Sequence, residues 1–185
     1  TPAADLFGYR LALLLTGDAA AAGEILRAVR ASAPREMVHY RHRERRIAWL
    51  VGKIRTLALK RRAPEGSAPS GFVPEGIAAL PEPARGAYAL FLTLDEENVE
   101  EQADLARMPL AAYAGALVQA RQMLAPGTAF PRAPKLALHR PWGKDLKRIE
   151  KAVQAAAGTP ELTAQEETDS RWHQAVAEIS VPEGV

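Results

Sequence analysis

The sequence predicts an all-α fold. Its 185 residues are 48% hydrophobic and 25% charged, proportions that are typical of a folded globular chain. Alanine and leucine dominate the hydrophobic residues, whereas β-branched residues are sparse, and this balance favours helices over strands. In several segments the apolar residues recur three and four positions apart, which is the spacing of one face of a helix.

Composition also excludes several classes of protein. The chain has no cysteine, so disulfides, thiolate metal sites and cysteine nucleophiles are ruled out. Its apolar runs, such as residues 11–15, are far shorter than the roughly 18 residues of a membrane span. No segment resembles a signal peptide, and the chain begins at Thr1. This start leaves open that the chain is the soluble part of a longer, membrane-anchored protein.

Two helices are expected at the start of the chain, over residues 5–15 and 18–31. Between them, Gly17 is suited to ending the first helix and Asp18 to capping the second. Pro34 is then expected to interrupt the helical pattern, because a proline inside a helix removes one backbone hydrogen bond.

A longer third helix is predicted to follow Pro34 and to run to about Arg62. Its apolar residues, such as Ile47, Leu50 and Ile54, have helical spacing. Residues 1–62 contain 13 Lys or Arg against 5 Asp or Glu, a net charge of +8. The basic residues form a candidate nucleic-acid-binding stripe, and the alternative is a solvated helix face. The stripe consists of Arg41, Arg43, Arg45, Arg46, Lys53, Arg55, Lys60, Arg61 and Arg62.

A segment rich in proline, glycine and serine marks the clearest domain boundary. Residues 63–76 read APEGSAPSGFVPEG, a composition that is typical of a linker. We therefore place a linker at 64–77 between two helical units, 1–63 and 78–125.

The second unit has the apolar pattern of a helix-turn-helix. Val99, Ala103 and Leu105 define a short helix, and Pro109 suits the start of the next one. Leu110, Tyr113, Leu117 and Leu124 define that second helix. The helix has no cation before Arg121, which we include among the candidate nucleic-acid-binding residues. Residues 63–131 contain 3 Lys or Arg against 9 Asp or Glu, a net charge of −6, so this unit should repel a polyanion.

The last segment, 126–185, is predicted to be a helical extension. Helices are expected near 143–157 and after the capping-box pair Thr163 and Glu166. Two short helices bury too little surface for a core of their own, so we expect them to dock on the other units. The docking residues would be Leu146, Ile149, Val153, Trp172, Val176 and Ile179.

No pattern of catalytic or metal-binding residues stands out. The sequence lacks a Ser/His/Asp set, a glycine-rich nucleotide loop and paired catalytic carboxylates. His39 and His42 have no third ligand nearby, and the acids of residues 95–104 lack the spacing of a calcium loop. We therefore expect no enzymatic activity, cofactor, metal or small-molecule substrate.

Several motifs stand in a recognisable order. Residues 12–18 read ALLLTGD, and Trp49-Leu50 is followed by RTLALKRR at 55–62. In the second unit Leu80-Pro81 precedes Arg85, residues 99–103 read VEEQA, and residues 119–121 read QAR ahead of Leu124. These motifs resemble regions 2 and 4 of a bacterial RNA polymerase sigma factor of the extracytoplasmic-function type.

This resemblance implies a bacterial, cytoplasmic transcription protein whose partner is the RNA polymerase core or a sigma or anti-sigma regulator. The family's D-L-V-Q-E polymerase-binding patch corresponds to Glu24, Ile25, Leu26 and Arg27, followed by Ala28. The extension after residue 125 resembles the helical pieces with which anti-sigma proteins clasp sigma factors.

The departures from the family pattern concern DNA reading. The polar T-V-K-S-R start of the recognition helix is AYAGA here, at residues 112–116, and the turn glycine is Arg107. Reading bases in the major groove requires Arg, Lys, Asn or Gln side chains. The sequence therefore predicts a sigma-like regulator that has lost promoter reading and acts through protein–protein interaction, as a decoy, a scaffold or a self-inhibited regulator. The alternative is a working, divergent sigma factor.

Overall fold

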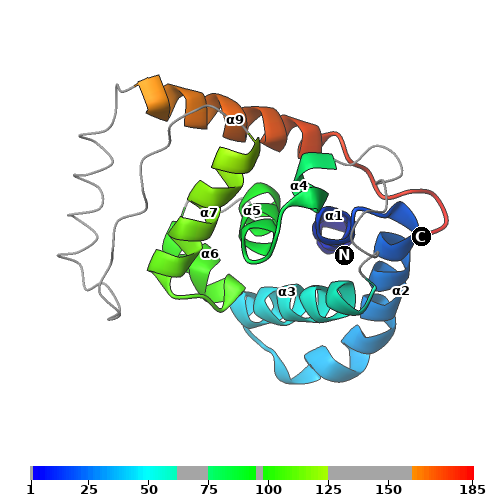
Figure 1. Ribbon diagram of the computed structural model, residues 1–185. Helices are drawn as coiled ribbons and strands as arrows, with labels where there is room; N and C mark the ends of the chain where they lie inside the picture. The colour runs from blue at the N-terminus through cyan, green and yellow to red at the C-terminus, as the bar shows by residue number, and fades with distance from the viewer. Residues whose placement is uncertain (1, 62–74, 95–97, 125–159) are drawn as a thin grey trace.

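The computed structural model describes residues 2–61, 75–94, 98–124 and 160–185 (Figure 1). Within these ranges every regular element is helical and none is a strand, so the all-α prediction is confirmed. Arg62 and the predicted docking residues Leu146, Ile149 and Val153 lie outside the described residues. The elements are α1 (Pro2–Thr16), α2 (Ala19–Glu36), the 3-10 helix η1 (Met37–His39), α3 (Arg43–Lys60), α4 (Glu75–Ala79), α5 (Ala84–Thr93), α6 (Val99–Ala106), α7 (Leu110–Leu124) and α9 (Pro160–Ala177).

The turn between α1 and α2 has the geometry that its sequence predicts. Gly17 adopts a φ of 70°, a left-handed conformation that glycine reaches without a steric penalty. The Asp18 carboxylate then accepts a hydrogen bond from the backbone N–H of Ala20 at 2.8 Å. Asp18 therefore caps α2 as predicted, because it pairs one of the donors that a helix N-terminus leaves free.

The expected break at Pro34 is wrong, because α2 continues through this proline to Glu36. Pro34 lies in the last turn of α2, two residues before the helix ends. Its missing N–H therefore removes only one backbone hydrogen bond, and the helix is not broken there. The third helix is also shorter than predicted. The chain forms η1 after α2, and α3 begins only at Arg43.

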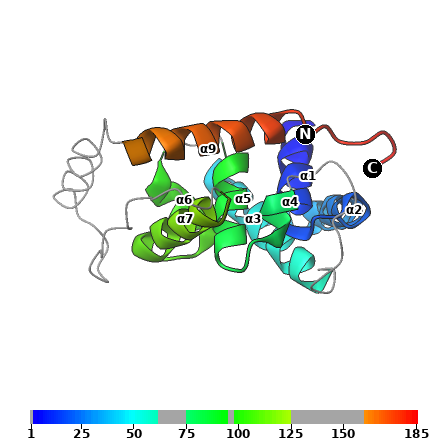
Figure 2. The same ribbon diagram turned by 45° about the horizontal axis from the view of Figure 1, so that its top comes forward.

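Helix α1 lies in the middle of the structure, between α5 and α2 (Figures 1 and 2). It also packs against α3, so five successive residues, 11–15, are buried. A helix that has neighbours on most sides is apolar around most of its circumference. The helices of both predicted units contribute to one core cluster, in which Leu14 of α1 and Tyr88 of α5 are fully buried. Helix α4 begins at Glu75, so residues 75–77 belong to a helix and not to the predicted linker.

Helices α6 and α7 form the predicted pair. The connection turns at Arg107, which has a φ of 55°, a left-handed conformation that is uncommon for a residue with a side chain. Helix α7 starts directly after Pro109, as predicted. Tyr113 is fully buried, and its hydroxyl donates to the side-chain carbonyl of Gln102 at 2.9 Å. This bond fixes α7 against α6.

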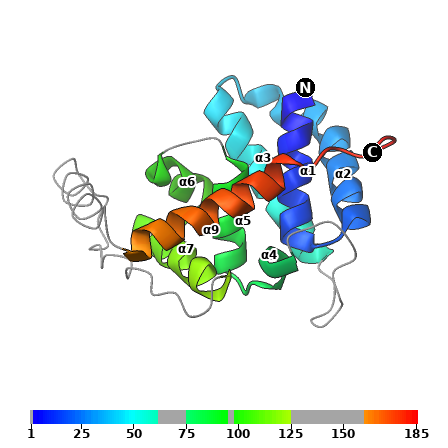
Figure 3. The same ribbon diagram turned by 90° about the horizontal axis from the view of Figure 1, so that it is seen from above.

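Helix α9 crosses over α5 and reaches α1 at its far end (Figure 3). It begins at Pro160, so Thr163 lies inside its first turn and does not start the helix as the capping-box pattern predicts. The residues after α9 continue past α1 toward α2 (Figure 1). Residues 160–185 thus contact α5 and α7 as well as α1 and α2.

Candidate functional site

The exposed face of α7 is the surface on which base reading would depend. Ala112, Gln119, Gln122 and Met123 are its exposed residues, and none of them is charged. Gly115 also belongs to the open side, since a Cβ atom there would have nothing within 4 Å. The face therefore offers two amide side chains and no cation. Two alanines of the AYAGA segment at residues 112–116 differ in exposure. Ala114 is partly exposed, whereas Ala116 is buried.

Arg121, the cation of α7, is 8% exposed and points into the packing between α7 and α9. Its Nε donates to Oδ1 of Asp169 at 3.0 Å, and its Nη2 donates to Oδ2 at 2.8 Å. The Arg121 guanidinium also lies 5.3 Å from the ring centroid of Phe91 on α5. Because a buried guanidinium requires a paired carboxylate, Arg121 is committed to α9. In this position the guanidinium is turned away from the exposed face of α7 that a nucleic acid would meet.

Tyr88 of α5 completes this buried cluster. Its hydroxyl donates to Oδ1 of Asp169 at 2.8 Å. Burial, and then the negative charge of Asp169, raise the pKa of Tyr88 far above its ordinary value. Burial likewise raises the pKa of Tyr113. Both phenols therefore remain protonated donors in the folded chain, and Asp169 is held by donors from two helices.

The predicted basic stripe is split into exposed and paired residues. Its exposed members are Arg41, Arg43, Arg45, Arg46 and Lys60. Four of these five lie at the N-terminal end of α3 or immediately before it. This end of the stripe is a cluster of cations that faces solvent.

Three other members of the stripe are engaged within the protein. Lys53 pairs with Glu36 at 2.6 Å, and Arg61 pairs with Glu24 at 3.3 Å. Arg55 donates from Nη1 to the backbone carbonyl of Ala106 at 2.6 Å, which ties α3 to the end of α6. Lys53, Arg55 and Arg61 therefore hold helices together, and the stripe is not one continuous exposed surface.

The predicted polymerase-binding segment of α2 is also divided by burial. Ile25 and Leu26 are core residues, at 0% and 2% exposed. In the predicted polymerase-binding segment, α2 therefore turns these two positions toward α1 and the rest of the core. Glu24 and Arg27 are exposed. Of these two, Glu24 pairs with Arg61 on α3.

The C-terminal residues lie on α1 and α2. Arg10 of α1 donates from Nη2 to the carbonyl of Ala177 at 2.7 Å and from Nε to the carbonyl of Ile179 at 3.0 Å. Arg30 of α2 donates to the carbonyl of Val185 at 2.5 Å. A Cβ atom added to Gly23 would lie 3.3 Å from Cγ2 of Val185. The chain end is thus seated on the α2 face that contains positions 23 and 30.

The described docking residues of α9 and its continuation contact the core. Val176 and Ile179 are 2% and 4% exposed. Trp172 is partly buried and packs against the core cluster, close to Leu124 of α7 and to Gly76. The segment after residue 160 is thus packed on the helices beneath it.

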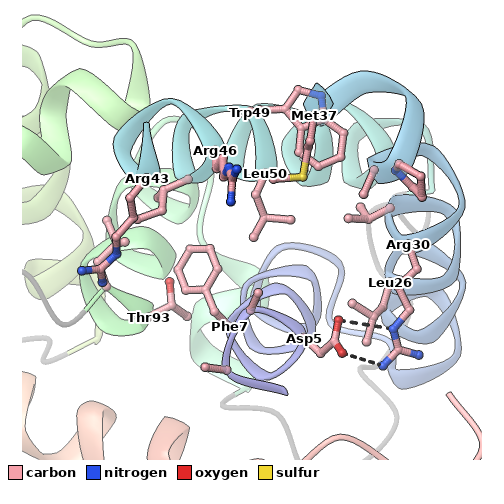
Figure 4. A pocket seen from close by; sticks show the side chains of 17 residues that line it. Asp5, Phe7, Leu26, Arg30, Met37, Arg43, Arg46, Trp49, Leu50 and Thr93 are labelled. Atoms are coloured by element: carbon pink, nitrogen blue, oxygen red, sulfur yellow. Dashed lines mark hydrogen bonds and ion pairs between the residues drawn. The ribbon is translucent and has the colours of Figure 1, made fainter. Parts of the chain in front are cut away.

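A groove with a volume of about 770 Å³ lies between α1, α2 and α3, with the end of α5 at one side (Figure 4). Apolar side chains line most of it, and Asp5, Arg30, Arg43 and Arg46 are its charged lining residues. Sequence reasoning did not find this groove. Its lining comes from four α-helices and η1, whose order in the chain gives no sign that they share an opening.

Comparison of the chain with known protein families, with curated protein sequences and with solved structures found no match. None of the described helices combines the length and the apolar character that crossing a membrane requires. In the described ranges, no three His, Asp or Glu side chains are placed to hold a metal ion together.

Proposed function

We propose that this protein is a sigma-factor-like transcription regulator that does not read promoters through α7 and acts through protein–protein interaction. In this proposal the C-terminal segment keeps the protein in a self-inhibited form. The observation that carries the proposal is the ion pair of Arg121 with Asp169, which commits the cation of α7 to α9. The sigma-like motifs supply the class of protein, and bacterial RNA polymerase core is the proposed partner.

The chemistry of α7 supports the loss of promoter reading. Direct readout needs Arg, Lys, Asn or Gln at the base edges, with cations against the phosphates. The exposed face of α7 retains Gln119 and Gln122 without a cation beside them. Glu100 and Glu101 are in the first turn of α6, where they add negative charge near the same helix pair. This arrangement would repel the DNA backbone.

The position of Val185 on α2 supports self-inhibition. Positions 23, 27 and 30 of α2 follow one another at helical spacing and share one face. Val185 contacts this face at Gly23 and Arg30, on either side of Arg27. Arg27 is an exposed residue of the segment that corresponds to the polymerase-binding patch. A polymerase that approached this face would meet the C-terminal residues first.

The test compares the full chain with a chain that ends at Ile179, in binding to purified bacterial RNA polymerase core. We expect the shorter chain to bind more tightly, because it frees the α2 face and keeps buried Ile179 in place. An unchanged denaturation midpoint would show that the shorter chain is folded. Failure of both chains to bind the core would contradict the proposed partner.

The alternative of a working, divergent sigma factor is favoured by one observation, the exposed cluster of Arg41, Arg43, Arg45 and Arg46. Titration of the full chain with duplex DNA separates the two functions. Binding through these arginines alone would be weak, independent of sequence and strongly weakened by salt. Sub-micromolar affinity for one DNA sequence over others at physiological salt would instead support the alternative.

A further inference from the structure

The groove between α1, α2 and α3 has an apolar floor. Phe7 of α1 and Leu50 of α3 lie at its centre, with Leu26 of α2 further along it (Figure 4). Phe7 and Leu50 are only partly buried although both pack against the core. A volume of about 770 Å³ lies within the range of roughly 300–1,000 Å³ of pockets that hold small molecules. The groove can therefore take an apolar group larger than a single side chain.

The charges around the opening are distributed unevenly. On the α2 side, Arg30 and Asp5 pair with each other at 3.2 Å and offer no net charge (Figure 4). On the α3 side, Arg43 and Arg46 line the opening and are exposed. None of the described carboxylates pairs with either of these two guanidinium groups. The α3 edge therefore carries two cations beside an apolar floor.

Arg46 is also held in place. Its Nε donates to the backbone carbonyl of Tyr40 at 2.8 Å. This bond uses one edge of the guanidinium and limits its rotation. A planar guanidinium that is fixed in this way matches a carboxylate, which accepts two parallel hydrogen bonds from it.

We propose that the groove binds an amphipathic monocarboxylate, a free fatty acid, with its carboxylate at Arg43 and Arg46 and its alkyl chain over Phe7 and Leu50 toward Leu26. The apolar floor selects the alkyl chain, and the two cations of the α3 edge, which pair with none of the described carboxylates, select a single anionic end. At the other end of the groove, Asp5 and Arg30 neutralise each other, so a second charged group on the ligand would find no unpaired partner in this ion pair. This inference stands apart from the proposed function, because it uses neither α7 nor the C-terminal segment.

Calorimetric titration of the full chain with dodecanoate, below the concentration at which it forms micelles, tests the site. We expect one molecule to bind per chain. Decanoate should bind roughly tenfold more weakly, because two buried methylene groups are lost. Dodecanol, which has the same chain and no charge, should bind more weakly than dodecanoate.

Two variants locate the ligand. The double substitution Arg43→Gln with Arg46→Gln should weaken dodecanoate binding roughly tenfold, since two partly exposed ion pairs are removed. Arg45→Gln is the matched control, because Arg45 is an exposed arginine of the same helix that does not line the groove. Ala33→Trp should fill the groove from α2 and abolish binding without lowering the denaturation midpoint.

Three results with the alkyl ligands would overturn the proposal. The first is no binding of dodecanoate, and the second is equal binding of dodecanol. The third is unchanged binding in the Ala33→Trp variant, which would place the ligand elsewhere on the chain. Binding of an acidic peptide in place of dodecanoate would likewise contradict it, and would make the groove a docking site for protein.

Discussion

Arg121 and Asp169 lie 48 positions apart in the sequence and form a doubly hydrogen-bonded ion pair that joins α7 to α9. Their side chains are 9% and 14% exposed. On α5, the Tyr88 hydroxyl donates to Asp169 and the Phe91 ring lies against the Arg121 guanidinium. One contact thus holds the C-terminal helix to the helix-turn-helix-like pair and withdraws a cation from the surface of α7.

Breaking this ion pair should destabilise the protein strongly. In the substitution Asp169→Asn, the Arg121 guanidinium loses its counter-charge while it stays buried, which should lower the free energy of unfolding by about 3 kcal/mol. Urea denaturation measures this loss. Glu167→Gln is the control, because Glu167 is exposed on the same helix, and it should change stability by less than about 0.5 kcal/mol. Equal effects of the two substitutions would show that the ion pair is weak.

Stability should fall at alkaline pH. The pKa values of Tyr88 and Tyr113 are raised above 10.0 by burial, so these phenols keep their protons in the folded chain. The unfolded chain loses the same protons near pH 10, and this loss favours unfolding as the pH rises further. Each of these two tyrosines should lower the free energy of unfolding by about 1.4 kcal/mol per pH unit above about pH 10.

The substitution Tyr88→Phe isolates one of these contributions. It removes the hydrogen bond to Asp169 and so lowers stability by a constant amount below about pH 9. Above about pH 10, Tyr88→Phe should also make the free energy of unfolding fall less steeply with pH. The slope should decrease by the contribution of one tyrosine, about 1.4 kcal/mol per pH unit. Denaturation curves across this range measure the slope. An unchanged slope would mean that Tyr88 ionises as easily in the folded chain as in the unfolded one.

Replacing Arg107 with glycine should relieve backbone strain in the turn between α6 and α7. Its φ of 55° costs a residue with a Cβ atom about 1 kcal/mol, which glycine avoids. We expect Arg107→Gly to be about 1 kcal/mol more stable than Arg107→Ala. The comparison with alanine removes the side-chain contribution, because both substitutions delete the guanidinium. If the alanine variant is the more stable, the turn does not hold this conformation in solution.

Gly115 should be replaceable with a gain in stability. It lies inside α7, and a Cβ atom there would meet nothing within 4 Å. Alanine favours the helix over glycine by about 1 kcal/mol, so Gly115→Ala should raise the free energy of unfolding by roughly that amount. Gly86→Ala provides the contrast, since its Cβ atom would lie 3.0 Å from Oε2 of Glu82. A loss of stability in Gly115→Ala would show that this face of α7 is covered.

The local features of the fold were predictable from short stretches of sequence. Asp18 caps α2 and Pro109 precedes α7 as predicted, because a cap or a first-turn proline acts on the backbone within a few residues. The break expected at Pro34 failed, since the cost of a proline depends on how much helix follows it.

The candidate sites were predicted less well than the helices. Ile25 and Leu26 match a surface motif by position but belong to the core, because the neighbours of α2 decide which of its faces is covered. The groove was not predicted at all. Its floor combines Phe7 with Leu50, and its cations come from the start of α3.

The sequence by itself therefore determined the all-α class, the cap at Asp18 and the start of α7, since these depend on propensity, periodicity and capping within a helical turn or two. Only the tertiary structure decided that Arg121 is buried against Asp169, that Val185 rests on α2, and that Arg43 and Arg46 border an apolar groove. The physical reason is that burial and pairing energies arise between segments far apart in the chain. The periodicity of one helix shows that it has an apolar face, but not which partner covers that face.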